Sequence, residues 1–301
     1  MTSVTIQLMH PGVEPHIPSG VANCKVEANL KPHKRKFLCA SGDYVESVGD
    51  NHLESRPVKS SPLAFWGEWE QPSLAIALPP PHNPSLPKAW HHPELPSNAS
   101  PIISSAPQST SKTGCASNEA DCVDSQEPNT DPFVFHPGFF YSCCKIKSTN
   151  MLSKLNSGDL VVFCSLVSGE MVFDTVFVVA EKLSLKDAHS KSSLFKAAVK
   201  RTGFKASKDC EVYQGATIDN KQNGMFSFFP AKPFTHESQI PHFARPKIPA
   251  KLISNDYFSG GNLRSFKIIR KNSAAYIWKA LVETTLKQNL VLGLSACIKP
   301  D

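Results

Sequence analysis

Two apolar runs with turn-forming residues around them constrain the fold of this chain more than any other feature. The first run covers residues 160–164 and the second covers residues 173–180. Both runs are rich in β-branched and aromatic residues, which favour strands. Gly158 can adopt the positive φ of a tight turn, and residues 165–169 supply the reversal between the runs. The pattern predicts a β-hairpin covered on both faces, as in a small closed barrel or a sandwich.

The hairpin resembles a known group of folds. A strand opened by LNSGDLVVF at residues 155–163 and followed by DTVFVV at residues 174–179 is similar to the PUA-like barrels, which include the EVE, ASCH and YTH groups. Most of these proteins bind RNA, or DNA that carries modified bases, and a few hydrolyse modified nucleosides. The resemblance implies an α+β fold with a central PUA-like β-barrel, to which the sequence adds a long Pro-rich loop and a C-terminal helix.

A wider resemblance covers most of the chain. Five segments resemble a family of bacterial proteins: QLMHPG at 7–12, FWGEWE at 65–70, NTDPFVF at 129–135, YQGAT at 213–217 and GMFSF at 224–228. The resemblance implies an accessory protein of DNA base modification, in the setting of a bacterial defence system. The implied chemistry is that of 7-deazaguanine, in which a 7-cyano-7-deazaguanine base in DNA is converted to its amide form.

Composition limits the compartment and the cofactors. A chain of 301 residues, of which 41% are hydrophobic, can bury one good core. Its nine cysteines include no C-x-x-C pair and follow no secretory signal, so we expect a reduced, cytoplasmic setting. No apolar run approaches the roughly 20 residues of a membrane span. Phosphate-loop, dinucleotide and zinc-protease motifs are missing, and the adjacent His91 and His92 cannot share one ion, so we expect neither a cofactor nor a metal.

The charge favours a polyanionic partner. The formal net charge is +6, with a sequence pI near 8.8. Basic residues form two clusters in the sequence. The first contains Lys31, His33, Lys34, Arg35 and Lys36, and the second contains Arg264, Lys267, Arg270 and Lys271. Each cluster can contact the phosphates of a nucleic-acid backbone and release counterions. The resemblance to proteins of DNA modification implies DNA rather than RNA as that partner. The alternative is a solvated basic face with no specific role.

The chain divides into three parts. Residues 1–78 form a β-rich N-terminal part of a single domain, and residues 79–128 form a Pro- and Ser-rich loop or lid that buries too little apolar surface to order itself. Residues 129–301 contain the barrel core. In that part we expect a helix at 183–200 with a break near Ser190, a helix at 273–288 capped by Ser273, and an edge strand at 289–298.

Two tryptophans and two glutamates lie within the segment 65–70. Trp66 and Trp69 can stack a base, and Glu68 or Glu70 can read its amino edge or act as a general acid or base. On a strand, Glu68 and Glu70 share one face while the tryptophans lie on opposite faces. The alternative is a buried tryptophan pair with solvated glutamates.

Cys144 is the candidate nucleophile. Its neighbour Lys145 can lower the pKa of the thiol, and the thiolate can attack a nitrile carbon to form a thioimidate. Cys144 would then serve the amide-forming reaction that the wider resemblance implies. The alternative is an inert core thiol, the commoner role of an intracellular cysteine in a strand.

The remaining candidate substrate-binding residues are Asn129, Asp131, Tyr213 and Arg245. Asn129 and Asp131 lie where the long loop re-enters the fold, a frequent position for ligand contacts, although Asp131 can instead shape the turn before the following proline. Tyr213 and Arg245, together with His10 and Thr217, are distant in sequence and converge only if the fold brings them together.

Three hypotheses follow. An enzyme holds a modified base at the tryptophans, moves protons with Glu68 or Glu70 and attacks with Cys144. A non-catalytic reader uses the same aromatic residues to bind a modified base and the basic clusters to hold the nucleic-acid backbone. A third possibility is a subunit that docks a partner protein of a modification or defence system through the long loop.

Overall fold

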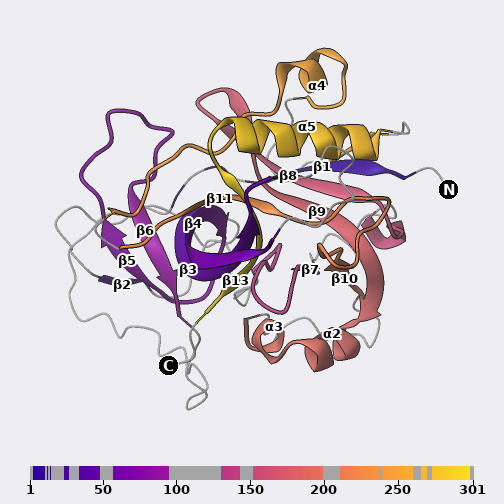
Figure 1. Cartoon of the computed structure of the whole chain (residues 1–301), viewed down its shortest axis with the longest axis horizontal. Coiled ribbons are helices and arrows are strands. Elements are labelled where there is room, and N and C mark those ends of the chain that lie inside the picture. Colours follow the sequence, from indigo (N-terminus) through magenta and orange to yellow (C-terminus); the bar gives the residue numbers. More distant parts are fainter. Residues whose placement is uncertain are drawn as a thin grey trace, which may run out of the picture.

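The computed structural model consists mainly of strands in two mixed β-sheets, with few helices (Figure 1). It describes residues 3–10, 12, 14, 24–26, 34–47, 57–94, 130–142, 152–198, 211–236, 239–259, 266–269 and 273–298. This arrangement agrees with the expected α+β class. No described helix combines the length and the apolar character that a membrane crossing needs.

The first sheet has six strands and is built around the predicted hairpin. In spatial order its strands are β12 (Phe266–Ile269), β1 (Thr5–Met9), β8 (Leu160–Val167), β9 (Glu170–Ser184), β10 (Glu211–Gly215) and β7 (Phe140–Tyr141). The β1–β8 pair is parallel and the other neighbours are antiparallel.

The second sheet has seven strands. In spatial order these are β13 (Val291–Cys297), β11 (Phe229–Pro233), β4 (Lys59–Glu68), β3 (Arg35–Val45), β6 (Ala89–Pro93), β5 (Ser73–Ala77) and β2 (Cys24–Val26). The β3–β6 pair is parallel, and the other neighbours are antiparallel. Strands from the two predicted parts, 1–78 and 129–301, therefore share both sheets.

The β8–β9 hairpin confirms the prediction from the apolar runs. Gly158 has φ +86°, and the turn between the strands is made by Ser168 and Gly169 at φ +51° and +80°. Alternate side chains enter two different cores: Val161 faces the core shared with the second sheet, while Val162 faces the core beneath α5. Both faces of the hairpin are therefore covered.

Strand β13 is not an edge strand as predicted, because it pairs with both β11 and β3. Since β11 also pairs with β4, and β4 with β3, these four strands form a closed circuit of pairings. The sequence pattern could not show this, because weak alternation of apolar residues is compatible with either position.

The described residues contain helices in both predicted helical segments, 183–200 and 273–288, together with two short helices that were not predicted. The helices are η1 (Leu152–Lys154, 3₁₀), α2 (Leu185–Lys191), α3 (Ser193–Ala198), α4 (Ala250–Ser254) and α5 (Ala274–Lys287), of which η1 and α4 are the two that were not predicted. The expected break falls at Ser192, between α2 and α3. The predicted cap is wrong, because the Ser273 side chain makes no capping hydrogen bond. Helix α5 covers the first sheet through Ile277, Trp278 and Leu281 (Figure 1).

Part of the predicted loop 79–128 is a strand. Residues Ala89–Pro93 form β6, which pairs with β5 and, in parallel, with β3. Trp90 packs against a small core around Phe37 and Trp66, so it anchors this segment to the sheet. The prediction of a loop is therefore wrong for β6, and residues 95–128 lie outside the described ones.

Candidate functional site

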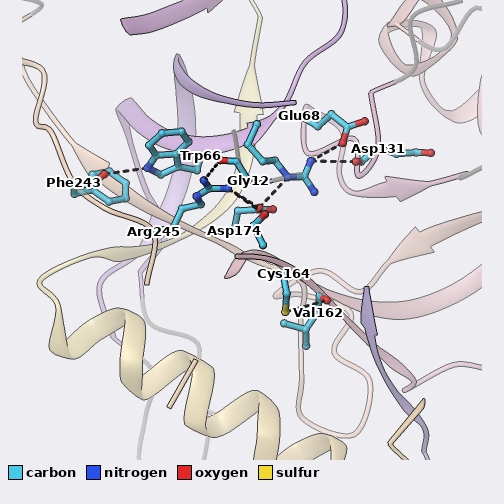
Figure 2. A network of polar contacts seen from close by, with 11 residues as sticks. Gly12, Trp66, Glu68, Asp131, Val162, Cys164, Asp174, Phe243 and Arg245 are labelled. Carbon is cyan, nitrogen blue, oxygen red and sulfur yellow. Dashed lines mark hydrogen bonds and ion pairs between the residues drawn. The ribbon is translucent and has the colours of Figure 1, made fainter. Parts of the chain in front are cut away.

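A buried network of charged side chains lies between the two sheets (Figure 2). At its centre, the Arg35 guanidinium contacts two carboxylates, with Nη1 2.7 Å from Glu68 Oε2 and Nε 2.9 Å from Asp174 Oδ2. All three side chains have 0% exposure. A buried charge is tolerated when it is paired, so the network satisfies charges that the sheets have removed from water.

Strand register brings these residues together. Arg35 begins β3 and lies directly opposite Glu68, the last residue of β4. Asp174 comes from β9 of the other sheet, where it is the charged residue within an otherwise apolar run. The network therefore ties the first sheet to the second through their side chains.

Burial shifts the protonation of the carboxyl groups. Desolvation raises the pKa of Glu68 to about 8, against the opposing effect of Arg35 and with a further upward contribution from Asp131. Desolvation also raises the pKa of Asp174, although both Arg35 and Arg245 oppose the shift. Below about pH 8, Glu68 can therefore hold a proton and still accept the hydrogen bond from Arg35 at Oε2.

Arg245 extends the network toward the surface. Its Cζ lies 4.6 Å from the centroid of the Trp66 ring, and its Nη1 is 3.9 Å from Asp174 Oδ2. It donates hydrogen bonds to Ser165 Oγ, at 3.2 Å, and to the carbonyl oxygen of Gly12. Desolvation lowers the pKa of Arg245 to about 10, so the side chain stays cationic at neutral pH.

Arg245 also lines a pocket of about 400 Å³ at the turn end of the β8–β9 hairpin. The polar lining includes Ser168 and Glu170 from the hairpin, Ser85 from the loop before β6, and Lys247. Apolar contacts come from Pro84, Val167, Val172 and Ala244. Two cations beside hydroxyl groups and an apolar wall suit a ligand that is partly anionic and partly flat and apolar.

Comparison with models of protein families, with curated proteins and with solved structures found no match. The chemistry of the chain's own residues therefore carries the functional conclusion. Among the residues that the structure describes, no group of three or more His, Cys, Asp or Glu side chains is placed to hold a metal ion.

The side chains of the segment 65–70 lie in different environments. Trp66 is buried, donates from Nε1 to the Phe243 carbonyl oxygen at 3.0 Å and supports Arg245. Trp69 has 0% exposure and packs on the far side of the sheet against Phe135. The tryptophans thus lie on opposite sides, as expected, but the buried surroundings of Trp69 contradict a base-stacking role.

The two glutamates do not act as a pair. Glu68 belongs to the Arg35 network, whereas Glu70 lies near Lys36, whose pKa it raises against desolvation. Both carboxyl groups are buried, with residue exposures of 2%. The expectation that the two carboxylates share one strand face is therefore wrong, because β4 ends at Glu68, and the alternative of solvated glutamates is wrong as well, because both are buried.

The first basic cluster is not a surface for phosphates. Arg35 and Lys36 have 0% exposure, because β3 begins inside the molecule, and Lys34 is half-buried. Counting charges cannot separate a surface lysine from a buried one, which explains the error. Lys31 and His33 of this cluster lie outside the described residues, as do Arg264, Arg270 and Lys271 of the second predicted cluster. Lys267 of the second cluster lies in β12 and pairs with Asp256 at 2.9 Å.

The other candidates are dispersed. Cys144 and Asn129 lie outside the described residues. Asp131 supports its own loop, since its Oδ1 accepts a hydrogen bond from the Ser142 backbone N–H at 3.1 Å. Tyr213 is buried, its hydroxyl accepts a hydrogen bond from the Leu155 N–H at 3.2 Å, and desolvation raises its pKa to about 12.

The structure does not bring His10, Tyr213, Thr217 and Arg245 to one pocket. Thr217 lines a different pocket, beside Asp43 and His136, and the buried His10 stacks on the Phe163 ring. Arg245 is thus the predicted ligand-binding residue that the structure places in a cavity of suitable size.

Sequence reasoning missed Asp174 and Lys247. A signal for Asp174 was present, because a charged residue inside an apolar strand needs a buried partner. Lys247 carried no local signal: it reaches the pocket because its backbone bridges Val172 at the start of β9. Cys164, beside this network, is buried and its thiol pKa is raised well above its usual value, so it is no substitute nucleophile.

Proposed function

We propose that this protein is a non-catalytic reader of nucleic acid, in which the Arg245 pocket receives a base together with its phosphate. The observation that carries the proposal is the position of Arg245, held between the Trp66 ring and Asp174 at the wall of the 400 Å³ pocket. A cation fixed in this way is pre-organised for an anionic group, so binding costs little side-chain entropy.

The composition of the pocket supports a nucleotide. Lys247 lines the pocket with Arg245, and it pairs with Glu170 at 3.4 Å, with both of these side chains largely exposed. Exposed ion pairs of this kind contribute little to stability, so Lys247 can leave Glu170 and bind a phosphate at little cost. The apolar wall and the Ser85 and Ser168 hydroxyl groups supply a flat surface and hydrogen-bonding groups for a base.

We propose further that the fold is PUA-like. The hairpin that carries the resemblance lies at the centre of the first sheet, and the closed circuit of β3, β4, β11 and β13 is compatible with a small barrel. The pocket lies at the turn end of that hairpin. On this proposal a modified base in DNA is the natural ligand.

The competing proposal is the conversion of 7-cyano-7-deazaguanine to its amide by Cys144 with Glu68 or Glu70. The raised pKa of Glu68 would suit a general acid at neutral pH. However, Glu68, Glu70 and Trp69 are all buried, so a substrate cannot reach them without opening the contact between the sheets. The reader therefore accounts for the geometry better than the enzyme does.

Calorimetric titration with deoxyguanosine 5′-monophosphate and with short oligonucleotides tests the reader. We expect Lys247→Gln to weaken binding several-fold at low salt, and Arg245→Lys to weaken it about tenfold or more, because the lysine loses the planar contacts to Ser165, Gly12 and Trp66.

The matched control is Lys186→Gln. Lys186 is an exposed lysine in α2, which follows the far end of β9 from the pocket, so its loss changes the net charge equally without touching the site. Lys247 is also at the surface, so its variant should fold even if Arg245→Lys does not. Equal affinity of Lys247→Gln and Lys186→Gln, or no nucleotide binding by the wild type, would refute the proposal.

A further inference from the structure

Two tyrosines and a set of lysines share the surface formed by α4, α5 and β12. Tyr276, in the first turn of α5, is 44% exposed, and its ring centroid lies 6.1 Å from that of the half-buried Tyr257. The Lys251 Nζ lies 5.5 Å from the Tyr276 ring centroid. Lys267 of β12 lies beside Tyr257 through its contacts to Asp256. We call these four residues the tyrosine–lysine face.

The charge of this face is positive but moderated. Lys251 is 4.0 Å from Glu283 and Lys267 is 2.9 Å from Asp256, and the exposed Lys279 follows Tyr276 by one turn of α5. The Lys251–Glu283 pair is long and about half exposed, so Lys251 can turn to an incoming phosphate at little cost. The first turn of α5 contains no acidic residue, which leaves the positive end of the helix dipole uncompensated by side-chain charge.

A short stretch of chain links this face to the Arg245 pocket. Residues 245–251 run from the pocket to α4, and the backbone bonds Phe173 N to Pro246 O and Ile248 N to Met171 O fix this segment along β9. This segment, which the two hydrogen bonds fix in place, therefore carries Arg245, Lys247 and Lys251 in that order. Figure 1 shows α4 next to α5, where the segment ends.

We propose that a single-stranded nucleic acid runs along this path, with one base stacked on Tyr276 and its phosphates on Lys251 and Lys247. The proposal rests on the proposed function, and it adds the strandedness of the bound polymer and the path that it follows on the surface. An exposed aromatic ring is a stacking platform for any unpaired base, whereas the bases of a duplex are already stacked on one another. The neighbouring lysines supply the backbone contacts that such platforms need.

Fluorescence anisotropy of a labelled twelve-nucleotide oligothymidine tests the path. Tyr276→Ala should weaken oligonucleotide binding about fivefold or more. Tyr276→Phe keeps the aromatic ring and should bind the oligonucleotide as the wild type does. Lys251→Gln should reduce the slope of log affinity against log salt by about 0.7, the loss of one phosphate contact to a single strand. The control Lys186→Gln should reduce the affinity at fixed salt, and the slope of log affinity against log salt, by less than Lys251→Gln does.

The outcomes separate this inference from the proposed function. If Tyr276→Ala weakens binding of the oligonucleotide and leaves binding of the mononucleotide unchanged, the path is supported. Three results would overturn it: unchanged oligonucleotide affinity in Tyr276→Ala, equally tight binding of a duplex of the same length, or full displacement by an acidic peptide, which would assign the face to a protein partner.

Discussion

The Arg35 network allows a sharp test of the stability that buried ion pairs provide here. In Arg35→Met, the unbranched apolar side chain keeps most of the volume, so little cavity forms. Glu68 and Asp174, at 2.7 and 2.9 Å from the guanidinium, both lose that cation. Removing one partner of a buried pair typically costs about 3–5 kcal/mol, and we expect a loss in this range at pH 9.

The loss should depend on pH. At pH 9 the medium lies above the wild-type Glu68 pKa of about 8, a pKa that Arg35 itself lowers. In the folded variant, Glu68 must either stay buried as a carboxylate without this cation or take up a proton, and each of these costs free energy. At pH 6 Glu68 is protonated, and the loss should be smaller. Urea unfolding followed by tryptophan fluorescence measures both values, since Trp66 lies at the edge of the network.

The matched control is Lys59→Met. Lys59 pairs with Glu46 at 2.6 Å, nearly the same distance, but these side chains are 48% and 52% exposed. We expect no measurable change in the free energy of unfolding for this variant, because water screens the pair. If Arg35→Met were no more destabilising than Lys59→Met, or showed no pH dependence, the assignment of a stabilising charged network would be wrong.

Two further perturbations test the fold and the protonation of the site. The folded protein keeps a proton on Glu68 that the unfolded chain releases above about pH 4.5, so this residue makes stability fall as the pH rises from about 4.5 to about 8. In Glu68→Gln the urea midpoint should therefore fall less steeply over this pH range. Equal pH dependence of the urea midpoint in the wild type and the variant would contradict the raised pKa. In Gly42→Ala, a methyl group would collide with the Ser295 carbonyl oxygen of β13, so we expect a lower thermal midpoint and a cost of about 1–3 kcal/mol, whereas an unchanged midpoint would contradict the β3–β13 pairing.

Local patterns predicted the elements whose determinants lie within them. The β8–β9 hairpin follows from two β-branched runs and from residues able to adopt positive φ, and α5 follows from apolar residues at helical spacing. The broken helix at 183–200 was predicted for the same reason.

The errors concern contacts between distant residues. Arg35 and Lys36 were interpreted as surface cations because their neighbours in sequence are basic, yet the register of β3 between β4 and β6 buries them. The position of β13 depends on pairing with β3 across some 250 residues of sequence, for which no local pattern exists. The pocket itself is assembled from three separate segments, so of its lining only Arg245 was predicted.

The most direct test of the central claim is to incubate the protein with an oligonucleotide that carries 7-cyano-7-deazaguanine, recover the bound fraction and analyse its nucleosides by mass spectrometry. A non-catalytic reader should retain the oligonucleotide with its nitrile unchanged, and Lys247→Gln should retain less of it. Appearance of the amide would contradict the reader in favour of the enzyme, and failure to retain the oligonucleotide would contradict nucleic-acid recognition by this pocket.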